Sequence, residues 1–199
     1  MNNPKSYNSN VTRLRYAVVF VASANLLYFF VEFNMAKHIG SVSLYADSID
    51  FLEDTAVNSI VLISLFFSSR IKHMVSILLA FLLLVPITAA FFTAWEKFVN
   101  PLTPASDLLS LTAFGALLVN ITCAFVLAKS KNDGGSLSKA AFLSSRNDAI
   151  ANIAMLLAAF SAMIWPSFWP DLLVGIGIAL INLDSAKEIL ETTQQERRS

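Results

Sequence analysis

Four acidic side chains occur within the short stretch YADSIDFLED, from Tyr45 to Asp54, and the chain on both sides of it is strongly apolar. An ionisable group inside a membrane span is costly, so it faces a bundle interior or a water-filled path and is a candidate for function. Carboxylate oxygens are the ligands that hard divalent cations prefer. The stretch therefore indicates cation binding inside a membrane.

The spacing of these acids places most of them on one face of a helix. At 100° per residue, one stripe about 80° wide contains three acids and an amide, namely Asp47, Asp50, Asp54 and Asn58. Glu53 lies well off this stripe, and we assign it only a flanking role.

A second polar stripe occurs in the segment SSRNDAIAN. Four-residue intervals place Ser144, Asp148 and Asn152 on a single helix face, with Asn147 beside Ser144. Two such stripes that face each other would form an oxygen-lined cage, and ligand pairs from two helices suit a divalent ion. We therefore predict a cation site between the two stripes.

Several of these residues also have a purely structural interpretation. Asn25, Asn58 and Asn152 are able to act as hydrogen-bond partners between helices. Asp47 lies near the predicted boundary of its span, where it would be solvated. Arg146 could pair with Asp148 and neutralise the site without a metal.

Burial of Asp50, Asp54 and Asp148 together is too costly for a purely structural role. The surplus of buried acids over buried bases indicates that protons or metal ions supply the missing positive charge. Glu32 and Asp184 also lie within apolar segments, where they either line the path or pair with polar neighbours.

The elements that position these residues are membrane-spanning helices. The chain has 199 residues, of which 56% are hydrophobic, with 16 Phe, and a span needs about 20 mostly apolar residues. Suitable stretches are 16–36, 44–67, 74–94, 107–128, 141–165 and 171–190. We predict an all-α, polytopic membrane protein, a bundle of six transmembrane helices over 13–191 with polar tails at 1–12 and 192–199.

The charge pattern predicts orientation and excludes some partners. Lys and Arg concentrate in the segments that face inward if the N-terminus is inside, and the opposite loops hold only Lys37 and Lys97, which predicts N-in and C-in. The formal net charge is zero, and no basic stripe suggests nucleic acid. We expect a multi-pass protein of the bacterial cytoplasmic membrane, with Cys123 as a small core residue.

Three segments carry a family resemblance: GSVSLYADSIDFLED, SSRNDAIAN and PDLLVGIGIALINLDSAKEIL. In order and spacing they resemble the cation diffusion facilitator family of divalent-metal transporters. The resemblance implies a six-helix membrane domain, usually dimeric, that exports zinc or a similar metal in exchange for protons. It implies no permanently bound cofactor, since the metal ion, among Zn, Cd, Mn, Fe and Co, is the transported substrate.

The resemblance also implies the ligands. Family members bind the ion with a His-or-Asp, three residues, Asp pair in helix two and a second pair in helix five, which correspond to Asp50 with Asp54 and Ser144 with Asp148. Ser144 stands where the family commonly has His or Asp, and a neutral hydroxyl is a poor zinc ligand. An all-oxygen cage favours harder ions such as manganese or magnesium, and Asn147 is a candidate for the missing ligand.

A second departure from the family concerns the end of the chain. Most members continue into a cytoplasmic ferredoxin-like domain that dimerises, so we expect a homodimer formed here through the membrane domain. The leading alternative function is a degenerate, non-transporting relative that acts as a membrane interaction subunit. An intramembrane hydrolase is disfavoured because His38 and His73 are too peripheral to build its site, and we expect no enzymatic activity.

Overall fold

The structure, a computed structural model, describes the backbone of residues 4–64, 74, 87–130 and 135–181, and the side chains of residues 12, 15–60, 62, 74, 87–129 and 146–181. Its labelled helices are α1 (Pro4–Ile39), α2 (Val42–Ser64), α4 (Ser106–Ser130) and α5 (Gly135–Ile164). Helical segments also cover 87–99 and Trp169–Ile181. The described residues contain no strand, so the predicted all-α class is confirmed.

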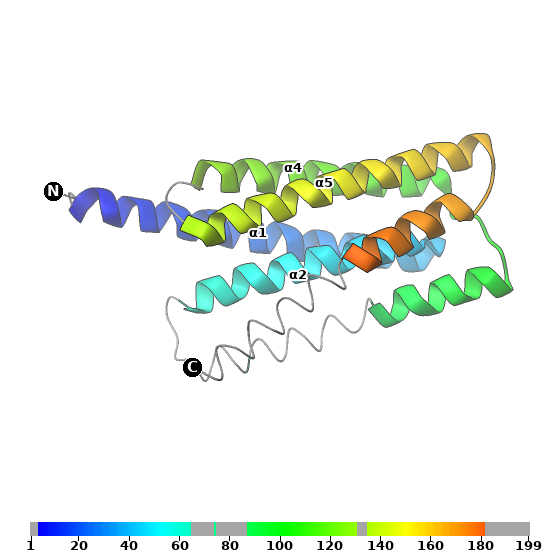
Figure 1. The fold of residues 1–199 in the computed structure, drawn as a ribbon, viewed down its shortest axis with the longest axis horizontal. Coiled ribbons are helices and arrows are strands. Elements are labelled where there is room, and N and C mark those ends of the chain that lie inside the picture. The colour runs from blue at the N-terminus through cyan, green and yellow to red at the C-terminus, as the bar shows by residue number, and fades with distance from the viewer. Residues whose placement is uncertain (1–3, 65–73, 75–86, 131–134, 182–199) are drawn as a thin grey trace.

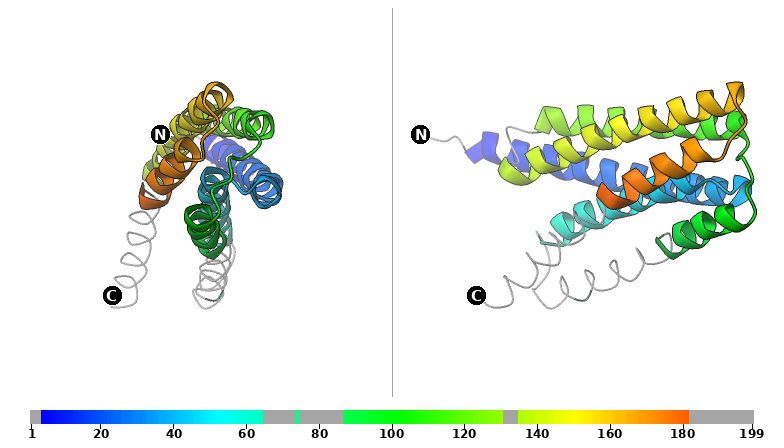
Figure 2. Two further views of the ribbon diagram at one scale, coloured as in Figure 1. Left: turned by 90° about the vertical axis from the view of Figure 1, so that its right-hand side faces the viewer. Right: turned by 45° about the vertical axis from the view of Figure 1, so that its right-hand side comes forward.

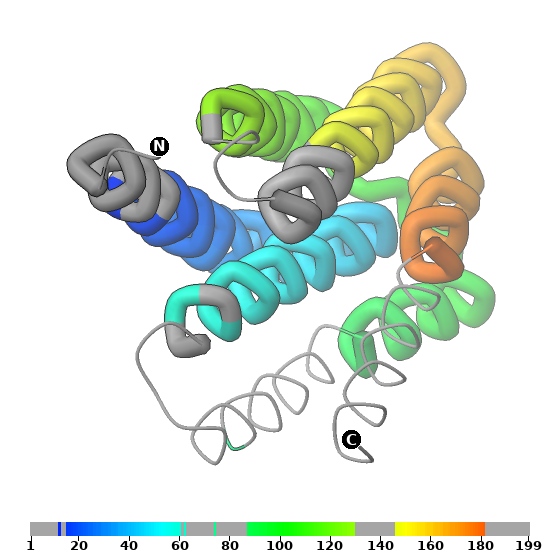
Figure 3. Tube along the Cα trace, turned by 60° about the vertical axis from the view of Figure 1, so that its left-hand side comes forward, coloured from blue at the N-terminus to red at the C-terminus, as the bar shows by residue number. Residues whose placement is uncertain are grey.

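Four helices, α1, α2, α4 and α5, run side by side along one axis (Figure 1). Helix α1 contacts α2 and α4, and α5 contacts α4 and α2. Viewed toward the ends of the helices, the four surround a common interior, and the segments 87–99 and Trp169–Ile181 lie outside it beside α2 (Figures 2 and 3). These two segments contain most of what the structure describes of the third and sixth predicted spans, and the remainder of those spans, apart from residue 74, lies outside the described residues.

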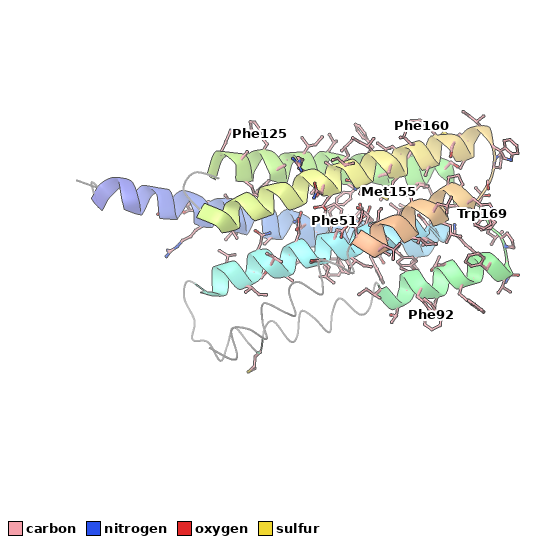
Figure 4. The ribbon with its side chains drawn as sticks, viewed as in Figure 1. Phe51, Phe92, Phe125, Met155, Phe160 and Trp169 are labelled. Atoms are coloured by element: carbon pink, nitrogen blue, oxygen red, sulfur yellow. The ribbon has the colours of Figure 1, made fainter. Side chains whose placement is uncertain are left out.

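The distribution of polar and apolar side chains is inverted relative to a water-soluble bundle. Phe92, Phe125 and Phe160 project from the outside of the helices and are more than half exposed (Figure 4). The interior contains apolar side chains such as Phe51 and Met155, but it also holds buried polar ones: Asn25, Glu32, Asp47, Asn120 and Asn152. An apolar surface around polar interior groups is the arrangement that lipid requires.

The length and composition of the helices support the same conclusion. Within the described residues, Arg15–Ile39, Ser106–Lys129 and Arg146–Ile164 are long and apolar enough to cross a membrane. Helix α2 is 23 residues long but carries the four acids of YADSIDFLED, which lower its hydropathy. The chain is an integral membrane protein, and the acid-rich α2 is one of the four helices that surround its interior (Figure 2).

A tight turn between α1 and α2 places their acids opposite each other. Gly40 adopts a left-handed backbone conformation, with φ of 64°, and Ser41 N donates to Ala36 O at 3.1 Å, which is the Schellman pattern for ending a helix. Helix α2 therefore returns along α1 after two residues. Glu32 and Asp47, at similar distances along the chain from Gly40, face each other across the pair.

A buried carboxylate fastens three segments at this end of the bundle, which the sequence predicts to be the outer end. Asp171 accepts hydrogen bonds from Val42 N at 2.9 Å and Ser43 N at 3.2 Å, and from the hydroxyls of Ser41 and Ser43 at 2.6 Å each. Lys97 Nζ lies 2.9 Å from the same carboxylate, and both side chains are almost fully buried. Asp171 therefore caps α2 from another helix and stabilises its positive N-terminal dipole.

Close packing of Trp169–Ile181 against α2 requires a glycine. A Cβ built on Gly175 would lie 2.8 Å from Ser43 N and 2.8 Å from the carbonyl carbon of Val42, whereas one on Gly177 meets nothing within 4 Å. We expect Gly175→Ala to lower the free energy of unfolding by about 1–3 kcal/mol through overpacking. Gly177→Ala is the matched control and should not destabilise, because alanine favours a helix.

Thermal unfolding of the purified protein in detergent measures both glycine variants. Equal midpoints for Gly175→Ala and Gly177→Ala would contradict the close approach.

Candidate metal site

Helices α2 and α5 bring the predicted acidic ligands into one region of the bundle. Asp50, Asp54 and Asp148 are each partly buried, and Asp148 lies close enough to Asp50 and Asp54 for their charges to interact. Among the side chains that the structure describes, no three His, Cys, Asp or Glu are close enough together to hold a metal ion. The acids are therefore neighbours without forming a closed coordination sphere.

A buried amide on α1 orients one of these acids. Asn25, which is fully buried, donates from Nδ2 to Asp54 Oδ2 at 3.1 Å. The Cys123 thiol donates to Asn25 Oδ1 at 3.5 Å, and Cys123 is buried as the sequence predicts for a core residue. The sequence signal for Asn25 is an uncharged polar residue in an apolar span, which does not distinguish a ligand-orienting role from a structural one.

The amide of Asn58, which shares the helix face of Asp54, is bonded within its own helix. Its Nδ2 donates to the backbone carbonyl of Asp54 at 2.7 Å, and the side chain is buried. Such a bond holds the amide against the backbone of α2. Glu53 is partly buried and its charge interacts with that of Asp54.

Asp47 is fully buried, so the alternative in which it is a solvated boundary residue is wrong. Its Oδ2 accepts from Asn152 Nδ2 at 2.7 Å, and Asn152 Oδ1 accepts from Asn120 Nδ2 at 3.1 Å. The fully buried Glu32 of α1 lies beside it. The turn between α1 and α2 and the packing of α5 thus place a second polar cluster about one helical turn from Asp50.

Of the remaining predicted residues, two are exposed and two fall outside what the structure describes. Arg146 and Asn147 are exposed, and Arg146 Nη2 donates to Asn147 Oδ1 at 3.3 Å. No ion pair joins Arg146 to Asp148 among the described side chains, so the proposed neutralising pair is not formed. The side chain of Ser144 and all of Asp184 lie outside the described residues.

Comparison with known families gives one match that spans most of the chain. A family model described as the cation efflux transmembrane domain matches residues 18–195. The matched region includes every residue of the two polar stripes and the capping carboxylate Asp171. The match therefore covers both the fold and the candidate site.

Proposed function

The chain belongs to the cation efflux family and is a cation transporter, and on that premise we propose that it exports divalent metal ions by proton antiport. The observation that carries this proposal is the grouping of Asp50, Asp54 and Asp148 on α2 and α5 of a bundle whose outer surface is apolar. Carboxylates that cluster within a membrane-spanning bundle suit a substrate that brings positive charge.

The proposed ligands are Asp50 and Asp54 from α2 with Asp148 and Ser144 from α5. Asn25 supports the set, since its hydrogen bond to Asp54 holds that carboxylate in one orientation, as outer partners do at metal sites. The three carboxylates are near one another, but they are not close enough together to hold a metal ion. A small approach of α5 toward α2 would complete the site around the ion.

In the proposed cycle, the ion enters from the cytoplasmic side and binds these carboxylates. The bundle then opens outward, and protons take the place of the ion on the same oxygens. Metal and protons compete for one set of ligands, so acidification weakens metal binding and a higher pH strengthens it. This competition couples the export of metal to the import of protons.

Ligand chemistry favours hard ions within the divalent class. The proposed set contains only oxygen donors, which suit manganese or magnesium, although zinc also accepts carboxylates. We further propose that the protein works as a homodimer formed through its membrane domain, in the cytoplasmic membrane of a bacterium.

Flux in proteoliposomes tests the proposal. The purified protein should move at least one of zinc, cadmium, manganese, iron and cobalt when a pH gradient is imposed, and collapse of the gradient with a proton ionophore should stop net accumulation. Metal affinity in detergent should increase with pH. Folded protein that moves none of these ions would instead favour the non-transporting alternative, and a pH-independent affinity would remove proton competition.

The hydrogen bond from Asn25 gives a finer test of the same site. We expect Asn25→Ala to weaken metal affinity by roughly 10- to 100-fold, the usual effect of losing a partner that orients a ligand. Flux at saturating metal should persist, because Asp54 is still present. Asn34→Ala is the matched control, since Asn34 is exposed on the same helix and its amide donates to Phe30 O within that helix.

Measuring flux as a function of metal concentration separates the effect of Asn25→Ala on metal affinity from its effect on flux at saturating metal. An unchanged half-saturating concentration would show that Asn25 does not act through Asp54.

A further inference from the structure

A second pair of carboxylates lies in the bundle interior and has no hydrogen-bond donor for most of its oxygens. Glu32 is fully buried, and neither Oε1 nor Oε2 has a partner among the described residues. Asp47, also fully buried, has no partner for Oδ1. Buried polar atoms are almost always satisfied in proteins, so three such oxygens together need an explanation.

The unpartnered oxygens belong to two neighbouring carboxyl groups. The carboxyl groups of Glu32 and Asp47 lie within hydrogen-bonding reach of each other. The other oxygen of Asp47 is held by Asn152 Nδ2 at 2.7 Å, and Asn152 is itself fixed by Asn120. The amide pair thus holds one oxygen of Asp47, while the other oxygen, Oδ1, has no partner among the described residues.

The described side chains supply no positive charge to this pair. The nearest elements contribute the acid Asp50, whose charge acts on Glu32, and the phenol of Tyr28. Lys97 is bound to Asp171, and Arg146 is exposed. Two carboxylates that lie next to each other in a low-dielectric interior repel strongly, so either one of them keeps its proton or a bound cation allows both to be ionised.

We propose that Glu32 and Asp47 form a second binding site for a hard divalent cation, distinct from the site at Asp50, Asp54 and Asp148. Three unsatisfied oxygens from two carboxylates match the charge of one divalent ion. Magnesium and manganese commonly bind through one or two carboxylates and retain several waters, so a third acidic ligand is not needed.

The position of this second site assigns it to the exit path. Asp47 precedes Asp50 by one turn of α2, and Asn152 follows Asp148 by one turn of α5, so the cluster lies about 5 Å nearer the end fastened by Asp171. That end is the predicted outer end. The inference rests on the proposed function for this role, because an ion leaving the first site would meet Glu32 and Asp47 next.

Binding of Mn²⁺ to the full-length protein in detergent tests the second site, with the loss of the free-ion EPR signal as the readout. The isosteric variants are Asp50→Asn, which weakens the first site, and Asp50→Asn combined with Glu32→Gln. Glu96→Gln in place of Glu32→Gln is the matched control, because Glu96 is exposed on the segment 87–99. Thermal unfolding of each variant in the same detergent confirms that it is folded.

We expect Asp50→Asn to retain a bound Mn²⁺, and the addition of Glu32→Gln to weaken that binding at least about tenfold, as loss of a carboxylate ligand should. Addition of Glu96→Gln should leave it unchanged. The second site would be overturned if folded Asp50→Asn protein bound no Mn²⁺, or if it bound Mn²⁺ equally with and without Glu32→Gln. If Mn²⁺ binding were equal but proton release differed, the pair would bind protons alone.

Flux of the wild-type protein separates this inference from the proposed function. If Asp50→Asn abolishes gradient-driven flux but Glu32→Gln has no effect on Mn²⁺ binding, the proposed transporter function stands and the second site is ruled out. A folded wild-type protein that neither transports nor binds a divalent ion would remove both.

Discussion

Asp50→Asn is expected to reduce gradient-driven metal flux by at least about 100-fold. The change keeps the shape of the side chain but removes one of three carboxylates, and even the loss of a residue that only orients a ligand costs roughly 10- to 100-fold at metal sites. Asparagine also cannot accept the proton that exchanges with the metal. The measurement is initial flux in proteoliposomes under a fixed pH gradient, at equal protein content.

Glu53→Gln is the matched control for Asp50→Asn. Glu53 is an acid on the same helix and also partly buried, but it lies off the stripe that contains Asp50 and Asp54. Its variant should retain flux within about twofold if helix face, and not total negative charge, determines binding. Equal losses of flux in the two variants would show that the acids act through the total negative charge of α2.

The largest expected effect on stability comes from Asp171→Asn. The amide nitrogen would replace an oxygen that now accepts hydrogen bonds, and Lys97 would keep a buried charge without its partner. Removal of one member of a buried ion pair costs about 3–5 kcal/mol, and loss of a helix N-cap typically adds about 1 kcal/mol. Unfolding in mixed micelles with increasing SDS measures the change in free energy.

A second substitution identifies the cause of that loss. Lys97→Met combined with Asp171→Asn removes the unpaired charge, so it should recover part of the stability lost in the single variant. Asp107→Asn makes the same chemical change at an exposed position in the first turn of α4 and should have little effect. No recovery in the double variant would show that the hydrogen bonds to α2 dominate over the ion pair.

The capping carboxylate and the candidate metal site are connected through one helix. Asp171 holds the N-terminus of α2, and Asp50 lies about two turns further along that helix. Any movement of α2 relative to Trp169–Ile181 would break hydrogen bonds to Asp171 and change the position of Asp50. Flux measured in Asp171→Asn protein that remains folded would therefore report on this coupling.

The sequence by itself determined the class of the protein and the identity of its acidic stripes. Hydrophobic length and helical periodicity are local properties, so they located the helices and placed Asp50 and Asp54 on one face. The ordered motifs also indicated the family that the match over 18–195 shows. These conclusions require no knowledge of how one helix packs against another.

Only the tertiary structure decided which polar groups are paired. The contacts of Asp171 with Val42 and Lys97, and of Asn152 with Asp47, join residues more than 70 positions apart. Such contacts depend on the axial register of neighbouring helices, and a shift of one residue along an axis, about 1.5 Å, is enough to break a hydrogen bond. A local pattern carries no record of that register, so the buried pair of Glu32 and Asp47 emerged only when α1, α2 and α5 were placed together.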